Sequence, residues 1–238
     1  MITWLRDKTR KSRRKFRKYL RLRGSSQNVF SRIYRKGGWG SKESSSGQGS
    51  ELSYTANLRR ELPALLKGYS VSRLLDAPCG DFNWMRHVVP GLGIEYIGGD
   101  IVEALVRRNQ REFGAVGVAF HHMDISSDPM PAADLMMVRD CLFHLSYSDI
   151  HRFLENFHRS GIGLLLTTTH LPPDGENSDI RTGDWRKIYL FAPPFCFPQE
   201  PLRRIEDWVP PHHRREMCLF TREQAAIALE AMSRNLGR

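Results

Sequence analysis

The sequence lacks the cysteine and histidine patterns of a disulfide framework or a metal centre. Its four cysteines, at 79, 141, 196 and 218, are widely spaced, and no two of them form a CxxC pair. Scattered cysteines of this kind indicate reduced thiols in a cytosolic protein. The histidine pairs 121–122 and 212–213 are adjacent, so their side chains point in different directions in any regular element. We therefore expect no bound metal.

Long apolar runs are also missing. The longest, such as 161–166, fall far short of the roughly 18–20 residues that a membrane span requires. Residues 1–5 are mildly apolar, but a dense run of Lys and Arg follows them instead of the hydrophobic core of a signal peptide. We therefore expect a cytoplasmic location.

Acidic residues are almost absent from the first 36 positions. This segment holds 14 Lys and Arg and a single acid, Asp7, a net charge of +13, whereas residues 37–238 carry −3 of the total of +10. We expect a basic N-terminal arm over 1–36, helical over 1–23. Its basic residues, interleaved with aromatics, suit RNA or an anionic membrane surface, and the latter would hold the protein peripherally at the inner membrane face.

The remainder divides into a Gly/Ser-rich segment at 37–50, a lid or linker, and a main domain at 51–238. Apolar runs typical of strands occur at 71–76, 96–100, 116–121, 133–138 and 162–168, with further possible strands at 187–191 and 216–220. Helical patterns occur at 52–68, 84–89, 102–113, 148–159 and 221–232, the first either kinked or divided at Pro63. This alternation predicts an α/β fold with a Rossmann-like, doubly wound and mostly parallel sheet.

The loop after the first strand lacks the G-x-G-x-x-G run of a dinucleotide site. It has one glycine, Gly80, between Asp76 and Asp81, and two carboxylates would repel a pyrophosphate. They suit a ligand with cationic groups, such as S-adenosylmethionine (SAM), which has an ammonium and a sulfonium and no phosphate. Gly80 would let the backbone approach that ligand closely.

Acids also follow the next two strands. Asp100 is placed to accept hydrogen bonds from both ribose hydroxyls, with Ile101 on the adenine face. Asp124 is placed to accept from the adenine amino group, and Ile125 to pack on the ring. A single such Asp is often only a helix cap or turn residue. Three at successive strand ends, about 24 residues apart, are better explained by a ligand.

These residues resemble motif I of the class I SAM-dependent methyltransferases, with Pro78 where a glycine is commoner. The likeness extends from about Phe30 to Trp185. Leu-Leu-Asp-Ala-Pro-Cys-Gly-Asp-Phe-Asn-Trp-Met at 74–85 and Arg-Asp-Cys-Leu-Phe-His-Leu-Ser at 139–146 resemble a little-characterised bacterial subgroup. Its members also carry a Trp-Gly…Glu-Ser-x-Ser-Gly-x-Gly-Ser segment, here 39–50. The resemblance implies a methyltransferase fold and a lid at 39–50 that is anchored by Trp39 and also contacts the acceptor.

The loop after the fourth strand holds the candidate catalytic residues. The resemblance implies that this loop faces the transferred methyl and that Arg139 contacts the donor. Asp140 is a candidate general base for a hydroxyl acceptor, and His144, one helical turn on, can act in the same way. Two other interpretations remain open: Asp140 can pair with Arg139, and His144 can be a capping or core residue.

The acceptor itself is expected near the fifth strand. His170 ends that strand, and the long loop after it holds Asn177, Asp179 and Trp185, residue types that suit a hydroxyl-rich acceptor such as a sugar. Ala-Pro-Pro-Phe at 192–195 superficially resembles the motif of amino-methylating enzymes, but it lacks the acid or amide and follows the wrong strand.

These patterns predict methyl transfer from SAM to a hydroxyl, or another oxygen or nitrogen nucleophile, of a small molecule or glycan. Two alternatives remain. One is an RNA methyltransferase that holds the polyanion with its basic arm. The other is a non-catalytic protein that only binds the donor.

Overall fold

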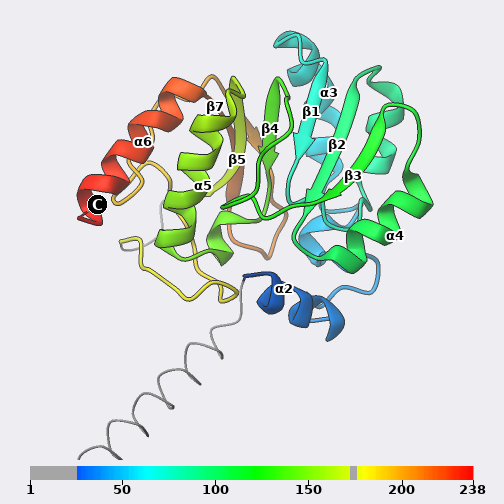
Figure 1. Ribbon diagram of the computed structural model, residues 1–238, viewed down its shortest axis with the longest axis horizontal. Helices are drawn as coiled ribbons and strands as arrows, with labels where there is room; N and C mark the ends of the chain where they lie inside the picture. The colour runs from blue at the N-terminus through cyan, green and yellow to red at the C-terminus, as the bar shows by residue number, and fades with distance from the viewer. Residues whose placement is uncertain (1–25, 172–175, 238) are drawn as a thin grey trace, which may run out of the picture.

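The computed structural model describes residues 26–171 and 176–237, in which one seven-stranded sheet runs through the molecule (Figure 1). The strands lie in the order β3-β2-β1-β4-β5-β7-β6. Their bounds are β1 Arg73–Asp76, β2 Glu95–Asp100, β3 Val118–His122, β4 Leu135–Val138, β5 Leu164–His170, β6 Arg203–Glu206 and β7 Arg215–Thr221. The predicted helix over 1–23 lies outside the described residues.

Strands β1 to β5 pair in parallel, and β7 runs antiparallel to both β5 and β6. The chain order reverses at β1, which lies between β2 and β4. In open α/β sheets a ligand binds at such a reversal, beyond the carboxyl ends of the strands. The predicted doubly wound, mostly parallel sheet is confirmed in this part of the chain.

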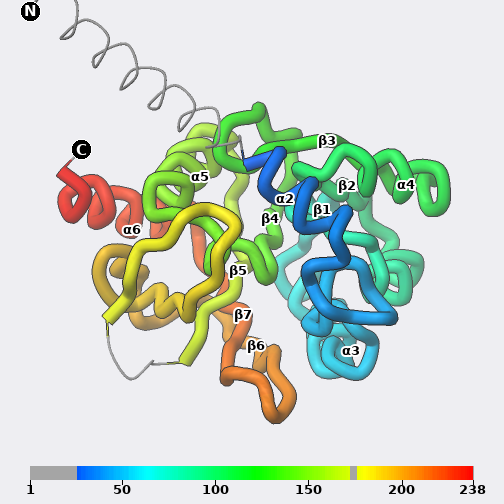
Figure 2. The backbone as a smooth tube through the Cα atoms, turned by 90° about the horizontal axis from the view of Figure 1, so that it is seen from below, coloured from blue at the N-terminus to red at the C-terminus, as the bar shows by residue number. Residues whose placement is uncertain are grey.

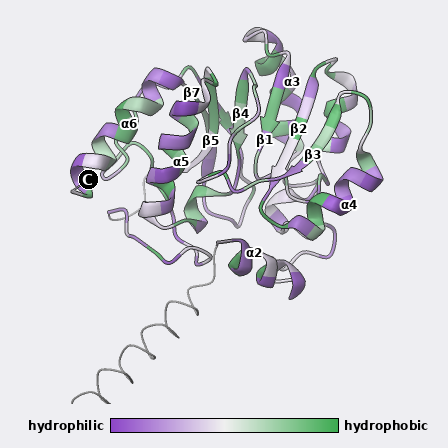
Figure 3. Cartoon of the chain, viewed as in Figure 1, coloured by the Kyte–Doolittle hydropathy of each residue, from purple (hydrophilic) through white to green (hydrophobic). Residues whose placement is uncertain are grey.

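Both faces of the sheet are buried, as the continuous apolar strands predict. Alternate residues of β4 serve opposite sides: Met136 belongs to the core cluster that includes α5 and α6, and Met137 to the cluster that includes α3. The hydropathy colouring shows green strands in the middle of the molecule and purple outer helix surfaces (Figure 3). The helices are α2 Ser26–Arg35, α3 Ala56–Gly68, α4 Glu103–Phe113, α5 Tyr147–Ser160 and α6 Arg222–Asn235.

The structure corrects the local predictions at 84–89 and 187–191, and at 52–68 it shows a single helix rather than two. Residues 84–89 form two short 3-10 turns, Met85–His87 and Val89–Gly91, because Pro90 has no N–H to continue a helical ladder. The segment 52–68 contains one continuous α3 with Pro63 inside it, since buried leucines on both sides of the proline pack against the sheet.

The possible strand at 187–191 is absent, and the sheet instead gains β6, which was not predicted. Ile188 and Leu190 are fully buried, but their N–H groups donate to the side chains of His170 and Thr169. The backbone N–H groups of these two buried residues therefore bond to side chains instead of to a neighbouring strand.

Two segments near the N-terminus of the described chain cover the carboxyl ends of the strands. Helix α2 lies below the sheet in Figure 1, and Figure 2 shows it and the segment that follows it crossing the ends of β1 and β2. Val29 and Ile33 of α2 approach Gly183 of the loop after β5. The reversal point at β1 thus lies beneath a cover made from residues 26–50.

Candidate functional site

A cavity of about 340 Å³ opens at the carboxyl ends of β1, β2 and β4, within the size range of small-molecule sites. Its floor includes Asp76, Gly80 and Asp100, and one side is formed by Arg139, Asp140 and His144. Residues of α2 and of the segment 45–50 also line it. The sequence motifs after three strands therefore meet around one space.

Asp76, at the end of β1, is 2% exposed and accepts a hydrogen bond of 2.6 Å from the hydroxyl of Tyr96. Burial raises the pKa of this carboxyl to about 7, although the Tyr96 hydrogen bond and the charge of Arg139 lower it. A cationic ligand in the cavity would favour the ionised form of Asp76.

Asp100, at the end of β2, accepts hydrogen bonds from the backbone N–H groups of Gly80 and Val102, at 3.1 and 2.9 Å. Burial raises its pKa to about 6 despite these hydrogen bonds. A carboxylate has about four lone-pair positions, so two remain available to a ligand. Asp100 also fixes the backbone of the loop after β1, because it holds the N–H of Gly80.

A smaller cavity of about 40 Å³ adjoins the first and shares Pro78, Asp100 and Ile101 with it. Asp124 and Ile125 line this second space. Asp124 Oδ1 accepts from both the N–H and the hydroxyl of Ser126, so this residue also caps the turn after β3. The predicted ribose and adenine residues are therefore contiguous.

The segment 39–50 is tied to the loop after β1. The carboxylate of Asp81 accepts from the Ser44 hydroxyl at 2.9 Å and from the Ser45 N–H at 2.7 Å, while the Asp81 N–H donates to the Ser46 hydroxyl. Asp81 does not line either cavity. Asp81 instead contacts three serines of segment 39–50, and its predicted contact with the donor stays a prediction.

Gly80 has a φ of 57°, and a Cβ at this position would lie 2.4 Å from the Ser46 hydroxyl oxygen. Glycine is needed here both for the backbone conformation and for the close approach of segment 39–50. Ser46 of the same chain is therefore the neighbour that leaves no room for a side chain at position 80.

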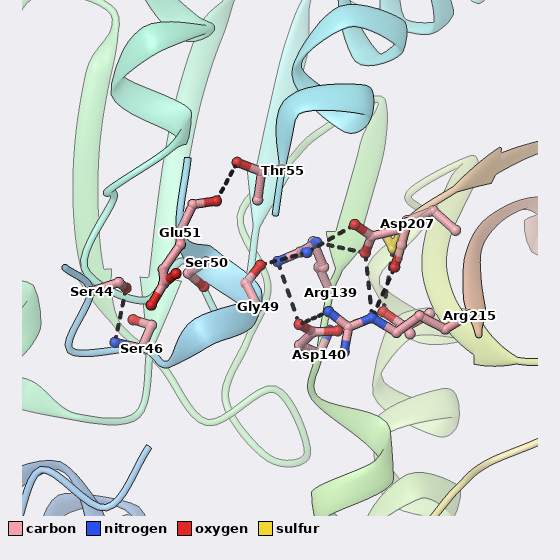
Figure 4. A network of polar contacts seen from close by, with 12 residues as sticks. Ser44, Ser46, Gly49, Ser50, Glu51, Thr55, Arg139, Asp140, Asp207 and Arg215 are labelled. Carbon is pink, nitrogen blue, oxygen red and sulfur yellow. Dashed lines mark hydrogen bonds and ion pairs between the residues drawn. The ribbon is translucent and has the colours of Figure 1, made fainter. Parts of the chain in front are cut away.

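Two arginines and two aspartates form a network of polar contacts (Figure 4), of which Arg139, Asp140 and Arg215 line the cavity. Arg139 makes a bidentate pair with Asp207, with Nε–Oδ2 at 2.8 Å and Nη2–Oδ1 at 2.9 Å, and donates to the carbonyl of Gly49. Asp140 lies 3.4 Å from Arg139 and 2.8 Å from Arg215. Burial alone would raise the pKa of Asp140, but the two guanidinium groups outweigh it and hold the pKa below its ordinary value.

His144 lines the cavity beside Trp39, with 4.9 Å between their ring centroids. Its Nδ1 lies 2.9 Å from the carbonyl oxygen of Asp184. Because a carbonyl can only accept, Nδ1 carries the hydrogen and Nε2 is left as the basic nitrogen. Burial lowers the pKa of His144, so its ring is neutral at physiological pH.

The predicted acceptor residues separate into two groups. Trp39 and the half-exposed Trp185 line the cavity. His170, Asn177 and Asp179 lie outside both cavities and hold backbone: His170 Nδ1 accepts from Ile188, Asn177 donates to the carbonyls of Tyr189 and Pro193, and Asp179 accepts from Tyr147 at the start of α5. Their polar groups hold backbone groups of the loop after β5 and of the start of α5, and their predicted contact with the acceptor stays a prediction.

Several residues at the site were not predicted. Among them are Phe30, Tyr34, Tyr54 and Arg215, which line the cavity, and Asp207, which pairs with Arg139. Phe30 and Tyr34 come from α2, in the segment interpreted as a basic arm. Tyr54 precedes α3, and its ring lies 4.7 Å from the Arg215 guanidinium. The spacing of Phe30 and Tyr34, four residues apart, was a usable signal for an apolar helix face, whereas nothing local marked the other three.

The overall fold is similar to that of solved methyltransferase structures. The protein aligns with a Burkholderia thailandensis 1,6-didemethyltoxoflavin N1-methyltransferase, solved with 1,6-didemethyltoxoflavin and S-adenosylhomocysteine (SAH). The TM-score is 0.58 at 14% identity, over 82% of this chain and 86% of that one. The fold is that of SAM-dependent methyltransferases.

Other methyltransferase structures align less extensively. A magnesium protoporphyrin IX methyltransferase from Synechocystis with bound SAH has a TM-score of 0.52 and 13% identity, covering 69% of this chain and 82% of that one. Human N-acetylserotonin methyltransferase in complex with SAM has a TM-score of 0.52 and 12% identity, covering 70% of this chain. The alignment spans about half, 52%, of the human protein. No family model and no curated protein matches the sequence.

Residues 26–171 and 176–237 contain neither a candidate membrane span nor a candidate metal-binding group. No helix there is long and apolar enough to cross a membrane. No group of three or more His, Cys, Asp and Glu side chains in the same residues is arranged to hold a metal ion.

Proposed function

We propose that this methyltransferase-fold protein binds SAM and transfers its methyl group to a hydroxyl, or another oxygen or nitrogen nucleophile, of a small molecule or glycan. The observation that carries the proposal is the convergence of Asp76, Asp100 and Asp124 on adjoining cavities at the reversal point of the sheet. The neighbouring structures with bound SAM or SAH support the same donor.

The residues present fit the donor. Asp100 keeps two lone-pair positions for the ribose hydroxyls, and Ile101, Asp124 and Ile125 form the adjoining space for adenine. Asp76 is buried with a raised pKa, so the ammonium end of the donor would supply the positive charge that this carboxyl lacks. Pro78, Gly80 and Arg139 complete the wall on this side. When bound, SAM supplies an activated methyl group with its own leaving group.

The chain's own residues would position the acceptor and accept its proton. His144, neutral and with Nε2 as its basic nitrogen, suits the role of general base. Asp140 is held ionised by two arginines, so it suits orientation of a hydroxyl better than proton uptake. Most of the rate enhancement would come from alignment of the two reactants in a closed cavity.

Segment 39–50 would act as a lid that encloses the donor. It contacts Asp81, Gly80 and Arg139 and also lines the cavity from Ser45 to Ser50. Trp39 anchors its start against His144. Deletion of residues 37–50 should therefore weaken donor binding, and unchanged donor affinity and turnover in that variant would refute the lid.

A methylation assay tests the proposed function. The full-length protein is incubated with SAM and a panel of phenols, sugars, amines, carboxylic acids and RNA, and SAH formation is measured. Acceptor-dependent SAH production supports the enzyme. SAM binding by calorimetry without turnover on any acceptor class would favour a protein that only binds the donor.

An RNA acceptor has one specific observation in its favour. The strongly basic residues 1–25 directly precede α2, whose Phe30 and Tyr34 line the cavity. A polyanion bound by this arm would thus lie close to the site. Turnover on RNA should fall steeply as salt rises, whereas turnover on a neutral small molecule should change little.

A further inference from the structure

Two residues that line the large cavity each have a buried polar atom without a hydrogen-bond partner among the residues that the structure describes. The Tyr54 hydroxyl and Asp140 Oδ1 are buried and make no hydrogen bond with any residue that the structure describes. Among the described side chains with such atoms, Tyr54 and Asp140 are the two that line the large cavity. Buried polar atoms in proteins are nearly always paired, so two such atoms on residues that line one cavity point to a ligand group.

Both atoms belong to side chains that contact the same guanidinium. Arg215 Nη2 donates to Asp140 Oδ2 at 2.8 Å, and the Arg215 guanidinium lies 4.7 Å from the centre of the Tyr54 ring. Tyr54 itself is 4% exposed. The Tyr54 ring and the Asp140 carboxylate therefore both lie against Arg215, at one part of the cavity lining.

The Tyr54 hydroxyl is protonated, whereas the Asp140 carboxylate is ionised. Burial raises the pKa of Tyr54 to about 12, so its hydroxyl stays protonated and can donate. Arg139 and Arg215 keep the pKa of Asp140 low against the effect of burial, so its carboxylate stays ionised and can only accept. The wall thus offers one donor and one acceptor.

We infer that Tyr54 and Asp140 together bind a hydroxyl group of the methyl acceptor, which makes the acceptor a neutral hydroxyl compound. A hydroxyl can accept from Tyr54 and donate to Asp140 at the same time. A carboxylate has no proton for Asp140 and is repelled by it. An ammonium adds charge beside two arginines and leaves the Tyr54 proton without an acceptor. The inference rests on the proposed function, since it places the acceptor in this cavity.

Three probes that share one ring test the inference: benzyl alcohol, benzylamine and benzoate. Their binding to the full-length protein is measured by saturation-transfer NMR, with and without SAH, and SAH affinity is measured by calorimetry on the same samples. The variant is Tyr54→Phe, which removes the hydroxyl and keeps the ring against Arg215. The matched control is Tyr69→Phe, because Tyr69 donates its hydroxyl to the Leu202 carbonyl away from the cavity.

We expect the wild type and Tyr69→Phe to bind benzyl alcohol about tenfold more tightly than the other two probes, and Tyr54→Phe to lose that preference with unchanged SAH affinity. Equal or undetectable binding of the three probes by wild type that binds SAH would overturn the inference alone. A tenfold loss of SAH affinity in Tyr54→Phe would assign Tyr54 to the donor and also overturn it. A wild type that does not bind SAH would overturn the proposed function instead.

Discussion

At the end of β1, Asp76 is buried against a tyrosine hydroxyl, whereas after β4 Asp140 lies between two guanidinium groups. Two aspartates in one cavity therefore have opposite pKa shifts. Burial raises the pKa of Asp76 to about 7, and Arg139 and Arg215 hold the pKa of Asp140 low. A carboxylate that forms no ion pair suits a cationic ligand. A carboxylate that is already paired with guanidinium groups suits a neutral ligand. This difference separates a donor side from an acceptor side.

The largest expected effect is on the donor side. Asp100→Asn removes the charge that would accept from both ribose hydroxyls, and two such hydrogen bonds to a charged group correspond to roughly a 10³-fold loss of affinity. Calorimetry with SAM measures it. Glu95→Gln is the control, since Glu95 is exposed at the start of β2, at the opposite edge of the sheet. Equal affinities for SAM in the wild type and Asp100→Asn would refute the donor assignment.

The next effect separates catalysis from binding. His144→Gln should lower kcat by about 100-fold, because a general base typically contributes 10² to 10⁴, and should leave SAM affinity unchanged. Since burial lowers the pKa of His144, wild-type turnover should be flat from pH 7 to 8 and fall only in acid. The acid limb should disappear in the variant.

The control for that experiment is His158→Gln, an exposed residue on α5. A kcat for His144→Gln within threefold of the wild-type value would contradict the base assignment and leave positioning as the source of the rate.

The sequence predicts the donor side better than the acceptor side, for a physical reason. Asp76 and Asp100 end β1 and β2, and Asp124 comes two residues after β3. Parallel strands bring their carboxyl ends to the same edge of the sheet. The periodicity of buried strands is enough to find them. The side-chain network on the acceptor side joins Arg139 to Asp207 and Asp140 to Arg215, pairs that are 68 and 75 residues apart in the chain.

Polar residues in the loop after β5 illustrate the same limit. Asn177 and Asp179 have the composition of an acceptor pocket, yet both hold backbone groups. Whether a polar side chain meets a ligand or its own chain depends on loop conformation, which no periodic pattern encodes. Tyr54 shows the converse, because its local sequence marks only the approach to a helix while long-range packing places it in the cavity.

The third prediction concerns the contact between Asp81 and segment 39–50, which covers the donor side of the cavity. Asp81→Ala removes the carboxylate that accepts from Ser44 and Ser45, so segment 39–50 should open, and SAM affinity should fall about 30-fold as the cover is lost. Calorimetry measures the affinity, and limited proteolysis within 39–50 reports the opening. Asp134→Ala is a matched control, since Asp134 also accepts three hydrogen bonds, from Ser72 and Arg73 at the far edge of the sheet. Equal protease resistance in both variants would refute the lid contact.

The smallest expected effect is on the stability of the protein without ligand. It tests the difference between the Asp76 and Asp140 carboxyl groups directly. The pKa of Asp76 is raised on folding, so the unfolded state binds fewer protons between about pH 4 and 7, and this residue lowers the free energy of unfolding as pH rises through that window. Asp140 has a lowered pKa, so its contribution is present above the ordinary pKa and is lost as pH falls.

Asparagine variants should therefore change stability in opposite directions at pH 8, measured by urea unfolding. Asp76→Asn should raise the free energy of unfolding by ~1 kcal/mol or more, since each pKa unit corresponds to about 1.4 kcal/mol. Asp140→Asn should lower it by ~1 kcal/mol or more, because Arg139 and Arg215 lose an ionised partner. Below about pH 3 the gain from Asp76→Asn should vanish, because both states of the wild-type protein then hold that proton. A loss of stability at pH 8 in both variants would mean that the two carboxylates are equally compensated, and the division of the cavity into a donor side and an acceptor side would lose its electrostatic basis.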